Sequence, residues 1–297
     1  MKILMKILQI IGTFLYAIRW LIVAVLAIGL PVYIYLAFIA KEPVFSPVND
    51  VELGKMSAQS LAEDPEEYPI LPETEYPEAY AHLRRIVGGI IDSPEIQYRD
   101  VFAYDQMKII NRDDVLNAFC TPGGYIYVYT GLIKYLEQED HLAGVLGHEI
   151  AHAERRHGSV RLQKEFGVKA LSGFLLLTIP LSTSDYINAS ILRDLMGLSY
   201  SRDQEAQADD DSVRYLSTSE YACDGTAGFF VKLRDVGDDV TIPEMLSDHP
   251  DTGSRVRDIK RAAERLGCST KPADPSRWKA FQESLPKSEA PEAPPPQ

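Results

Sequence analysis

The chain has 297 residues, of which 45% are hydrophobic, with a formal net charge of −13 and three cysteines. This composition excludes a collagen, a small disulfide-rich protein and a disordered polyampholyte. The acidic balance also argues against a nucleic-acid partner, because sequence-independent binders of DNA or RNA need a basic face. The length allows one or two globular domains.

The first 40 residues are basic and apolar, whereas the rest of the chain is acidic. Residues 21–40 form an uncharged run that, as a helix, is about 30 Å long and matches a bilayer core. The run is longer than the core of a usual signal peptide and does not end in a small-x-small cleavage site. We therefore predict a transmembrane helix within an N-terminal membrane anchor at residues 1–40. Because the basic residues precede it, the positive-inside rule predicts a single-pass protein of the bacterial inner membrane, with a cytoplasmic N terminus and a periplasmic domain.

Polar residues recur at helical spacing before the apolar run. Lys2, Lys6, Gln9 and Thr13 are three or four residues apart and form a polar stripe on a helix. Such a stripe can bind a membrane-protein partner, or it can be the start of one long anchor helix, and the sequence leaves both interpretations open.

Prolines and acidic residues mark two segments that lack a core of their own. Residues 41–76 carry prolines at short intervals and a cluster of acidic side chains, which predicts an extended, Pro-rich acidic linker. Residues 284–297 are a Pro-rich tail, which we expect to be disordered. The intervening residues 77–283 suffice for a full hydrophobic core and form the predicted globular domain.

Within this domain the apolar periodicity predicts strands first and helices later. The expected elements are a helix at 76–91, strands at 101–110 and 115–129, a short helix from 130, and helices at 140–158, 201–215, 226–236 and 252–266. Pro122, Gly123 and Gly124 interrupt the second strand. Thr130 and Asp140 are expected to cap their helices, and Gly237 and Gly267 are expected helix stops. This order predicts an α+β fold that is mainly helical with a small early sheet.

The motif HExxH occurs in the predicted helix at 140–158, as His148-Glu149-Ile150-Ala151-His152. Four residues make one helical turn, so both imidazoles lie on the same face and can hold one zinc ion. Glu149 stands beside them as a general base and not as a ligand. A catalytic zinc ion also needs a third protein ligand and an open position for water.

A later helix supplies candidates for the remaining roles. Glu205 can complete a site of two histidines and one glutamate, and Asp209, one turn further on, can accept the free ring N–H of a ligating histidine. Without the HExxH motif, both would be read as part of an acidic, solvated helix face. We therefore expect one zinc ion per chain as the cofactor.

Four stretches carry a resemblance to a known family. They are NAFCTPGGYIYVYTGLI (117–133), GHEIAHAERRHG (147–158), SYSRDQEAQAD (199–209) and HPDTGSRVRDI (249–259). In these stretches the chain resembles the membrane-associated HExxH zinc metallopeptidases, which include HtpX-type quality-control proteases and CAAX prenyl endopeptidases, and it is most similar to the single-anchor periplasmic type. Cys120 departs from the pattern, since relatives often have a small residue such as alanine there.

The resemblance implies a zincin-like fold in which His148, His152 and Glu205 hold the zinc ion. It also implies that Glu149 is the general base and that Asp209 supports a ligand. By the same resemblance, His249 and Arg255 lie near the zinc ion and stabilise the oxyanion of the reaction. Residues Asn117, Ala118, Phe119 and Cys120 are implied to be the edge strand along which an extended peptide pairs.

Plainer interpretations stay open for several of these residues. His249 and Arg255 can be a turn histidine and a helix-face arginine, or His249 can cap the zinc ion at rest. Residues 117–120 can equally be a central core strand. His157 lies about 140° around the helix from His152 and is interpreted as structural. The metzincin pattern is excluded. It requires a glycine at position 155 and a histidine at position 158, where this chain has Arg155 and Gly158.

The cysteines and one apolar segment complete the predictions. Cys223 and Cys268 lie at predicted helix ends and can form a disulfide, although pairing cannot be read from sequence. Cys120 in a hydrophobic strand is expected to be a buried thiol. Residues 170–181 are apolar but too short to span a membrane, and they fit a lid, a membrane-touching loop or a packed hairpin.

The sequence as a whole predicts a membrane-anchored zinc metalloendopeptidase that hydrolyses unfolded or misassembled cell-envelope proteins. The alternative is a non-catalytic, chaperone-like or adaptor protein with a structural zinc site. Glu149 argues against that alternative, because a structural site is closed by four protein ligands and has no use for a base.

Overall fold

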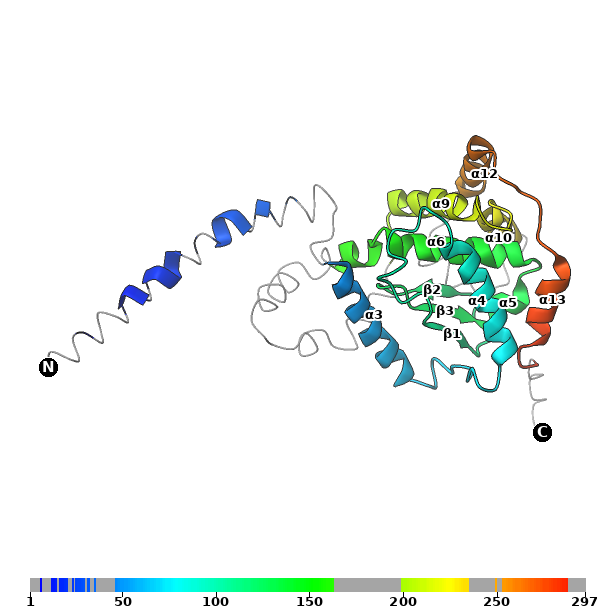
Figure 1. Ribbon diagram of the computed structural model, residues 1–297, viewed down its shortest axis with the longest axis horizontal. Coiled ribbons are helices and arrows are strands. Elements are labelled where there is room, and N and C mark those ends of the chain that lie inside the picture. Colours follow the sequence, from blue (N-terminus) through cyan, green and yellow to red (C-terminus); the bar gives the residue numbers. More distant parts are fainter. Residues whose placement is uncertain are drawn as a thin grey trace, which may run out of the picture.

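The computed structural model describes residues 46–162, 199–234, 249 and 253–287, together with some of the residues between 6 and 35. The elements of the domain are α3 (Pro47–Ala62), α4 (Pro77–Ile91), β1 (Met107–Ile110), β2 (Ala118–Cys120), β3 (Ile126–Tyr129), α5 (Thr130–Tyr135), α6 (Glu139–Glu154), α9 (Arg202–Leu216), α10 (Gly225–Arg234), α12 (Arg255–Leu266) and α13 (Pro275–Glu283). Helix α6 crosses the middle of the domain, with the sheet on one side and α9 and α10 on the other (Figure 1). The predicted α+β class, mainly helical with a small early sheet, is confirmed.

The three strands form one sheet in the order β1-β3-β2. Strand β3 is central and fully buried, and it runs parallel to β1 and antiparallel to β2. Strand β2 pairs with β3 through Ala118 and Cys120, opposite Val128 and Ile126, and has no second strand neighbour in the described part of the chain. Strand β2 is therefore an edge strand, which presents a row of backbone N–H and C=O groups along its outer side.

Only the last four residues of the strand predicted at 101–110 join the sheet. The residues before them form turns, in which the backbone N–H of Phe102 donates to the carbonyl of Tyr98 at 2.8 Å. The rings of Phe102 and Tyr104 are buried, with their centroids 5.9 Å apart. The apolar residues at 101–110 correctly predicted a buried segment, but the part before β1 buries its side chains in turns and not in a strand.

Helices α6, α9 and α10 pack closely because small residues lie between them. The Ser212 hydroxyl of α9 donates to the carbonyl of Gly144 in α6 at 3.0 Å and lies 3.0 Å from the Thr226 hydroxyl of α10. A Cβ atom at Gly144 would lie 2.1 Å from the backbone nitrogen of Thr226, so a side chain there would force the helices apart. This packing lays α9 along the face of α6.

The helix stop predicted at Gly267 is confirmed, since Gly267 ends α12 in the left-handed conformation with φ 63°. Ser201, where a helix was expected to begin, caps α9 through a capping box with Gln204. The caps predicted at Thr130 and Asp140 are wrong, because Tyr129 is the N-cap of α5 and Gln138 is the N-cap of α6. The Asp140 carboxylate instead accepts backbone N–H groups from Ala222 at 2.7 Å and from Ala273 at 2.9 Å. These donors are remote in sequence, so local spacing could not reveal them.

Helix α3 forms where the sequence predicted an extended linker. Ser46 and Asn49 make a capping box, and Pro47 occupies the first helical position, where it has no hydrogen bond to lose. The helix buries Leu53 and Leu61. The prolines of this segment therefore flank the helix and do not interrupt it, which is why proline content alone misassigned it.

A buried ion pair attaches α3 to the segment after α6. The Asp50 carboxylate accepts two hydrogen bonds from Arg156, at 2.5 and 3.1 Å, and one from the Ser159 hydroxyl at 2.5 Å. Asp50 is 1% exposed and Arg156 is 9% exposed. The interaction is charge-assisted and bidentate, so it holds α3 in a defined position against the domain.

We expect Asp50→Asn to lower the free energy of unfolding by about 3–5 kcal/mol, because the substitution breaks a buried ion pair by removing one charge. Urea denaturation followed by circular dichroism measures this loss. The control is Asp100→Asn on an exposed turn, which should change stability by no more than about 0.5 kcal/mol. Equal stability of the two variants would show that the pair contributes nothing.

The predicted transmembrane helix is not found. Among the residues that the structure describes, no helix is both long and apolar enough to cross a membrane. This finding contradicts the predicted single-pass inner-membrane localisation with a cytoplasmic N terminus and a periplasmic domain.

The structure contains the disulfide between Cys223 and Cys268, which joins the start of α10 to the end of α12. The bridge closes a segment of 45 residues, and closures of this kind typically stabilise a domain by about 2–4 kcal/mol. Cys120 is a buried free thiol, as predicted. Leu285 lies in the predicted tail but is buried in the core, so this residue belongs to the globular domain. The apolar segment 170–181 lies outside the described residues.

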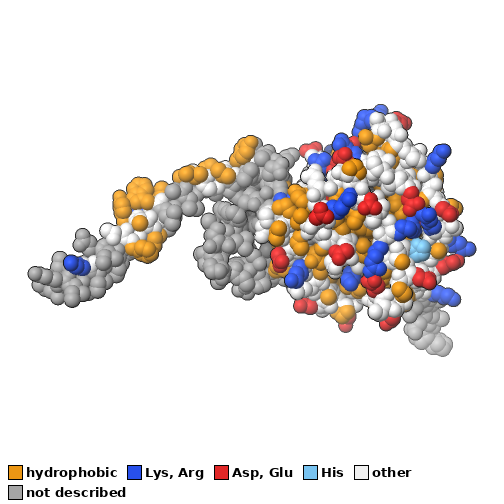
Figure 2. Space-filling view, in the orientation of Figure 1, with side chains coloured by type: hydrophobic (Ala, Val, Ile, Leu, Met, Phe, Trp, Pro, Cys, Tyr) orange, Lys and Arg blue, Asp and Glu red, His pale blue; other side chains and the backbone are white. Residues whose placement is uncertain are grey.

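Acidic and basic side chains are intermixed over the face of the domain seen in Figure 2. Several of them form exposed ion pairs, including Arg214 and Arg265 with Asp210 and Arg277 with Glu220. Exposed pairs of this kind contribute about 0–1 kcal/mol each. The stability of the domain therefore comes mainly from the buried core and from the disulfide.

Candidate metal centre

Four buried side chains bring their ligand atoms together between α6 and α9. On α6, His148 and His152 are one turn apart, and their Nε2 atoms are separated by 3.0 Å. On α9, Glu205 places Oε2 3.3 Å from His148 Nε2 and Oε1 3.6 Å from His152 Nε2. The fourth residue is His249, whose Nδ1 is 3.2 Å from His148 Nε2 and 3.0 Å from Glu205 Oε1. All four ligand atoms lie within 4.8 Å of one another.

Asp209 and Arg255 surround the outer side of this cluster. The His148 Nδ1–H donates to Asp209 Oδ1 at 2.9 Å, which directs Nε2 into the cluster. Arg255 forms a bidentate pair with Asp209 at 2.7 and 2.8 Å and places Nη1 3.0 Å from Glu205 Oε2. Arg255 thus orients both carboxylates from behind, at the start of α12.

His157, Gln207 and Tyr200 support His152. Burial lowers the pKa of His157 to about 4 despite its hydrogen bond to Gln207, so the ring is neutral. Its Nε2–H donates to Gln207 Oε1 at 3.1 Å, which leaves its Nδ1 to accept from His152 Nδ1 at 2.8 Å. His152 then directs its Nε2 lone pair into the cluster, and the Tyr200 ring stacks on it at 3.8 Å.

Sequence reasoning missed these three residues for a specific reason. The angular argument that set His157 aside assumes a continuous helix, but α6 ends at Glu154 and Arg156 adopts a left-handed backbone with φ 55°. This turn brings the His157 ring back to His152. The histidine five residues after the motif was the one available signal, and Gln207 and Tyr200 had none.

The electrostatics of the cluster favour a cation. Burial alone would raise the pKa of Glu205, but hydrogen bonds from His148 and His249 outweigh it and hold the pKa below its ordinary value. Burial would also raise the pKa of Asp209, but hydrogen bonds from Arg255 and His148 outweigh this effect and lower the pKa of the carboxyl. Hydrogen bonds to Asp209 and Glu205 raise the pKa of His148 to about 9 against the effect of burial, so His148 carries a proton on Nε2 as well as on Nδ1. A divalent ion can take the place of that proton.

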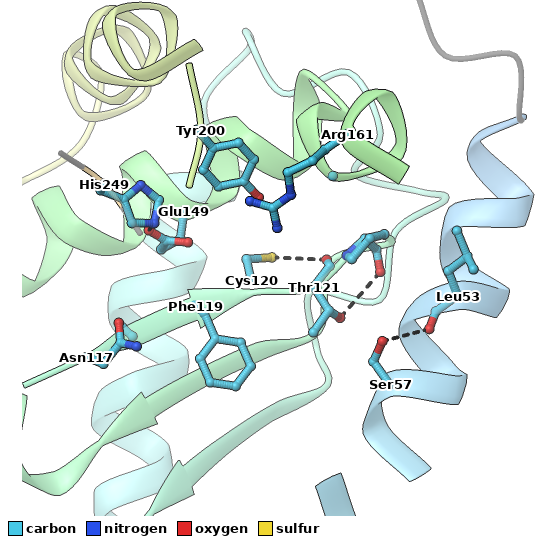
Figure 3. Close-up of a pocket in the computed structure, with 13 residues that line it drawn as sticks. Leu53, Ser57, Asn117, Phe119, Cys120, Thr121, Glu149, Arg161, Tyr200 and His249 are labelled. Carbon is cyan, nitrogen blue, oxygen red and sulfur yellow. Dashed lines mark hydrogen bonds and ion pairs between the residues drawn. The ribbon is translucent and has the colours of Figure 1, made fainter. Parts of the chain in front are cut away.

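Glu149 lies beside the cluster but outside it. Its Oε1 is 3.4 Å from His249 Nε2, its carboxylate accepts the backbone N–H of Cys120, and burial raises its pKa. Glu149 and His249 line a cleft together with the edge strand β2 (Figure 3). A buried carboxylate of raised pKa next to a candidate metal site is suited to accept and return a proton.

The donor set fits zinc. Imidazole nitrogens and a carboxylate oxygen are the ligands of catalytic zinc sites, and each histidine of α6 has a partner that fixes its tautomer. The three predicted ligands His148, His152 and Glu205 converge, and His249 joins them as a fourth donor. Arg255 lies close by, bonded to Asp209, rather than along the cleft.

Comparisons with known proteins agree with this site. The chain is 27% identical over 238 residues to a putative beta-barrel assembly-enhancing protease of Vibrio cholerae, a match that covers 73% of this chain and 48% of that protein. It is 24% identical over 218 residues to the metalloprotease YcaL of Escherichia coli, covering 72% of this chain and 80% of that protein. It is 32% identical over 159 residues to the mitochondrial metalloendopeptidase OMA1 of Danio rerio, covering 49% of this chain and 33% of that protein.

The chain spans about half or less of the length of the beta-barrel assembly-enhancing proteases that it matches in Vibrio cholerae and Yersinia pestis. The model of peptidase family M48 matches residues 77–263, a segment that contains α6, α9 and the start of α12. This match covers more than half of the chain and includes every residue of the His and Glu cluster, and the chain therefore belongs to peptidase family M48.

Proposed function

We propose that the protein is a zinc metalloendopeptidase that hydrolyses unfolded or misassembled cell-envelope proteins. The observation that carries the proposal is the position of Glu149, a buried base that borders both the ligand cluster and the cleft along β2. Similar proteins named as metalloproteases and as beta-barrel assembly-enhancing proteases support the reaction class and the envelope context.

His148, His152 and Glu205 would hold the zinc ion, which when bound polarises a peptide carbonyl and acidifies water. Glu149 takes the proton of the attacking water on its carboxylate and returns it to the nitrogen of the leaving amine. His249 lines the cleft and can stabilise the oxyanion or contact the ligands at rest. Arg255 acts as a positioning residue, because its guanidinium is bonded to Asp209 and Glu205.

The edge strand β2, with Asn117 before it, provides the binding surface for an extended substrate. An extended peptide that pairs with β2 gains main-chain hydrogen bonds whatever its sequence. A strand that is already paired on both sides in a folded sheet cannot pair with β2, so this mode of binding favours unfolded polypeptides. The substrate is therefore defined mainly by its conformation.

Digestion of casein by the full chain tests the proposal. Activity should disappear on removal of the metal with a chelator and return with stoichiometric zinc, while circular dichroism shows that the protein stays folded. The alternative of a non-catalytic adaptor is favoured by the four donors of the cluster, which can close a structural site. Stoichiometric zinc without any cleavage of casein would support that alternative.

Asp209→Asn tests the support of His148. The amide removes the negative charge that holds the His148 tautomer and pairs with Arg255, so the affinity for zinc should fall by about 10–100-fold. Competition with a fluorescent zinc chelator measures the affinity. Asp210→Asn is the control on the same helix, because Asp210 pairs with the exposed Arg214 and Arg265, and unchanged affinity is expected there.

A further inference from the structure

Helix α3 lies outside the segment matched by the family model, yet it lines the same cleft as the candidate catalytic residues. The family match begins at residue 77, and α3 ends at Ala62. Leu53 and Ser57 of α3 line the cleft together with Glu149, His249 and strand β2. In Figure 3, Leu53 and Ser57 of α3 lie at one end of the cleft and Glu149 and His249 lie at the other, with Cys120 and Thr121 between them.

Leu53 and Ser57 form the wall of the cleft on the α3 side. The ion pair between Asp50 and Arg156 holds this wall against α6, the helix that carries His148 and His152. Arg156 and Ser159, which bind Asp50, follow α6 directly and are separated from His152 by only a few residues. The same short segment also contains His157, whose ring contacts His152 and supports it. The position of α3 is therefore fixed relative to the candidate metal ligands. Residues that determine substrate specificity need to be held rigidly in this way.

Close backbone contact with the turn between β2 and β3 holds the wall from a second side. A Cβ atom at Gly54 of α3 would lie 2.2 Å from the carbonyl oxygen of Pro122. At Gly123, which has φ 77°, a Cβ atom would lie 2.4 Å from the Cα of Val51. Two glycines thus let the helix lie directly on the turn that ends the edge strand.

The cleft between this wall and Glu149 is mainly apolar. Ala118, Phe119, Cys120 and Pro122 line it from the sheet side, and Leu53 lines it from α3. Side chains of a peptide added to β2 alternate in direction, so every second one faces the same side of the added strand. A side chain bound near Thr121 therefore meets Leu53 and Ser57.

We propose that Leu53 and Ser57 of α3 determine the size of the substrate side chain accepted at the end of the cleft. This inference rests on the proposed function in that it takes the cleft along β2 as the peptide site. The preferred side chain is aliphatic and of limited length, because Leu53 and the sheet side of the cleft are apolar and α3 packs directly on the turn after β2. The enzyme distinguishes between substrate side chains by the space that Leu53 and Ser57 leave at the end of the cleft.

The inference predicts opposite effects for two substitutions. Leu53→Ala enlarges the end of the cleft and should raise the preference for phenylalanine over alanine at one substrate position by about tenfold, a usual value for a changed hydrophobic pocket. Ser57→Leu fills the same space and should lower that preference by a similar factor. The matched control is Val48→Ala, since Val48 lies on the outer face of α3 and is 63% exposed.

The test uses the full chain with Glu149→Gln as background, so that peptides bind without being cleaved. The probes are fluorescent decapeptides of unfolded sequence in which one position at a time carries alanine, leucine or phenylalanine. Affinities are measured by fluorescence anisotropy for the background and for its Leu53→Ala, Ser57→Leu and Val48→Ala variants. Circular dichroism and zinc content confirm that each variant is folded and loaded.

Support consists of opposite shifts in Leu53→Ala and Ser57→Leu at the same peptide position, with no shift in Val48→Ala. Ratios that stay within twofold at every position in both variants would overturn the inference, and so would a complete lack of peptide binding to the background. Casein cleavage by the unsubstituted protein separates the two proposals. If casein is not cleaved but the affinity shifts occur, the peptidase function fails while the role of α3 stands.

Discussion

Glu149→Gln is expected to keep the fold and the zinc ion but to lower kcat by about 10²–10⁴-fold, the usual contribution of a general base. The glutamine has the same shape and can still accept the backbone N–H of Cys120, so the cleft stays intact. It cannot take a proton from water. The initial rate of casein cleavage at saturating substrate measures the loss, and metal analysis measures the retained zinc.

The matched control for this experiment is Glu154→Gln. Glu154 also lies on α6 and is buried, and it accepts hydrogen bonds from the Tyr104 hydroxyl and from the backbone of Gln97 and Tyr98, away from the metal centre. This variant should lose stability but keep its turnover per folded molecule. Equal turnover of Glu149→Gln and the unsubstituted protein would remove Glu149 from the chemistry and favour the adaptor interpretation.

Glu205→Ala should lose both the zinc ion and the activity. The substitution removes the carboxylate ligand, which is also a partner of His249 and of Arg255, and the positive charge of Arg255 then repels a cation. The affinity for zinc should fall by more than about 100-fold, the upper value for loss of a residue that only supports a ligand. Equilibrium dialysis followed by metal analysis gives the affinity.

The control for Glu205→Ala is Asp203→Ala, which changes an exposed acidic residue in the same turn of α9. We expect this variant to bind zinc as the unsubstituted protein does. Stoichiometric zinc in Glu205→Ala would mean that His148, His152 and His249 suffice as ligands. Glu205 would then have to be removed from the proposed ligand set.

Short-range patterns predicted the parts of the site that lie on regular helices. The spacing of His148 and His152 fixes their common face, and the position of Glu205 and Asp209 on a capped helix could be read from Ser201 onward. Local chemistry also predicted the stop at Gly267. These predictions succeeded because the interactions involved lie within one or two helical turns.

Predictions failed where a remote partner decides the structure. The supporting role of His157 depends on a backbone reversal at Arg156, a residue that itself binds Asp50 from a helix about a hundred positions earlier. Asp140 binds the backbone of two distant segments rather than its own helix end. Composition alone assigned α3 to a linker, because it records prolines but not their place relative to a helix start.

By itself, the amino-acid sequence determined the α+β class, the helix that carries HExxH, the second helix with Glu205 and the family. The tertiary structure alone decided that His249 lies among the candidate ligands, that Arg255 turns toward Asp209, and that α3 lines the cleft. The physical reason is the range of the interactions. Periodicity and capping act over a few residues, whereas the convergence of charged side chains and the docking of α3 follow from packing between segments that are far apart in the chain.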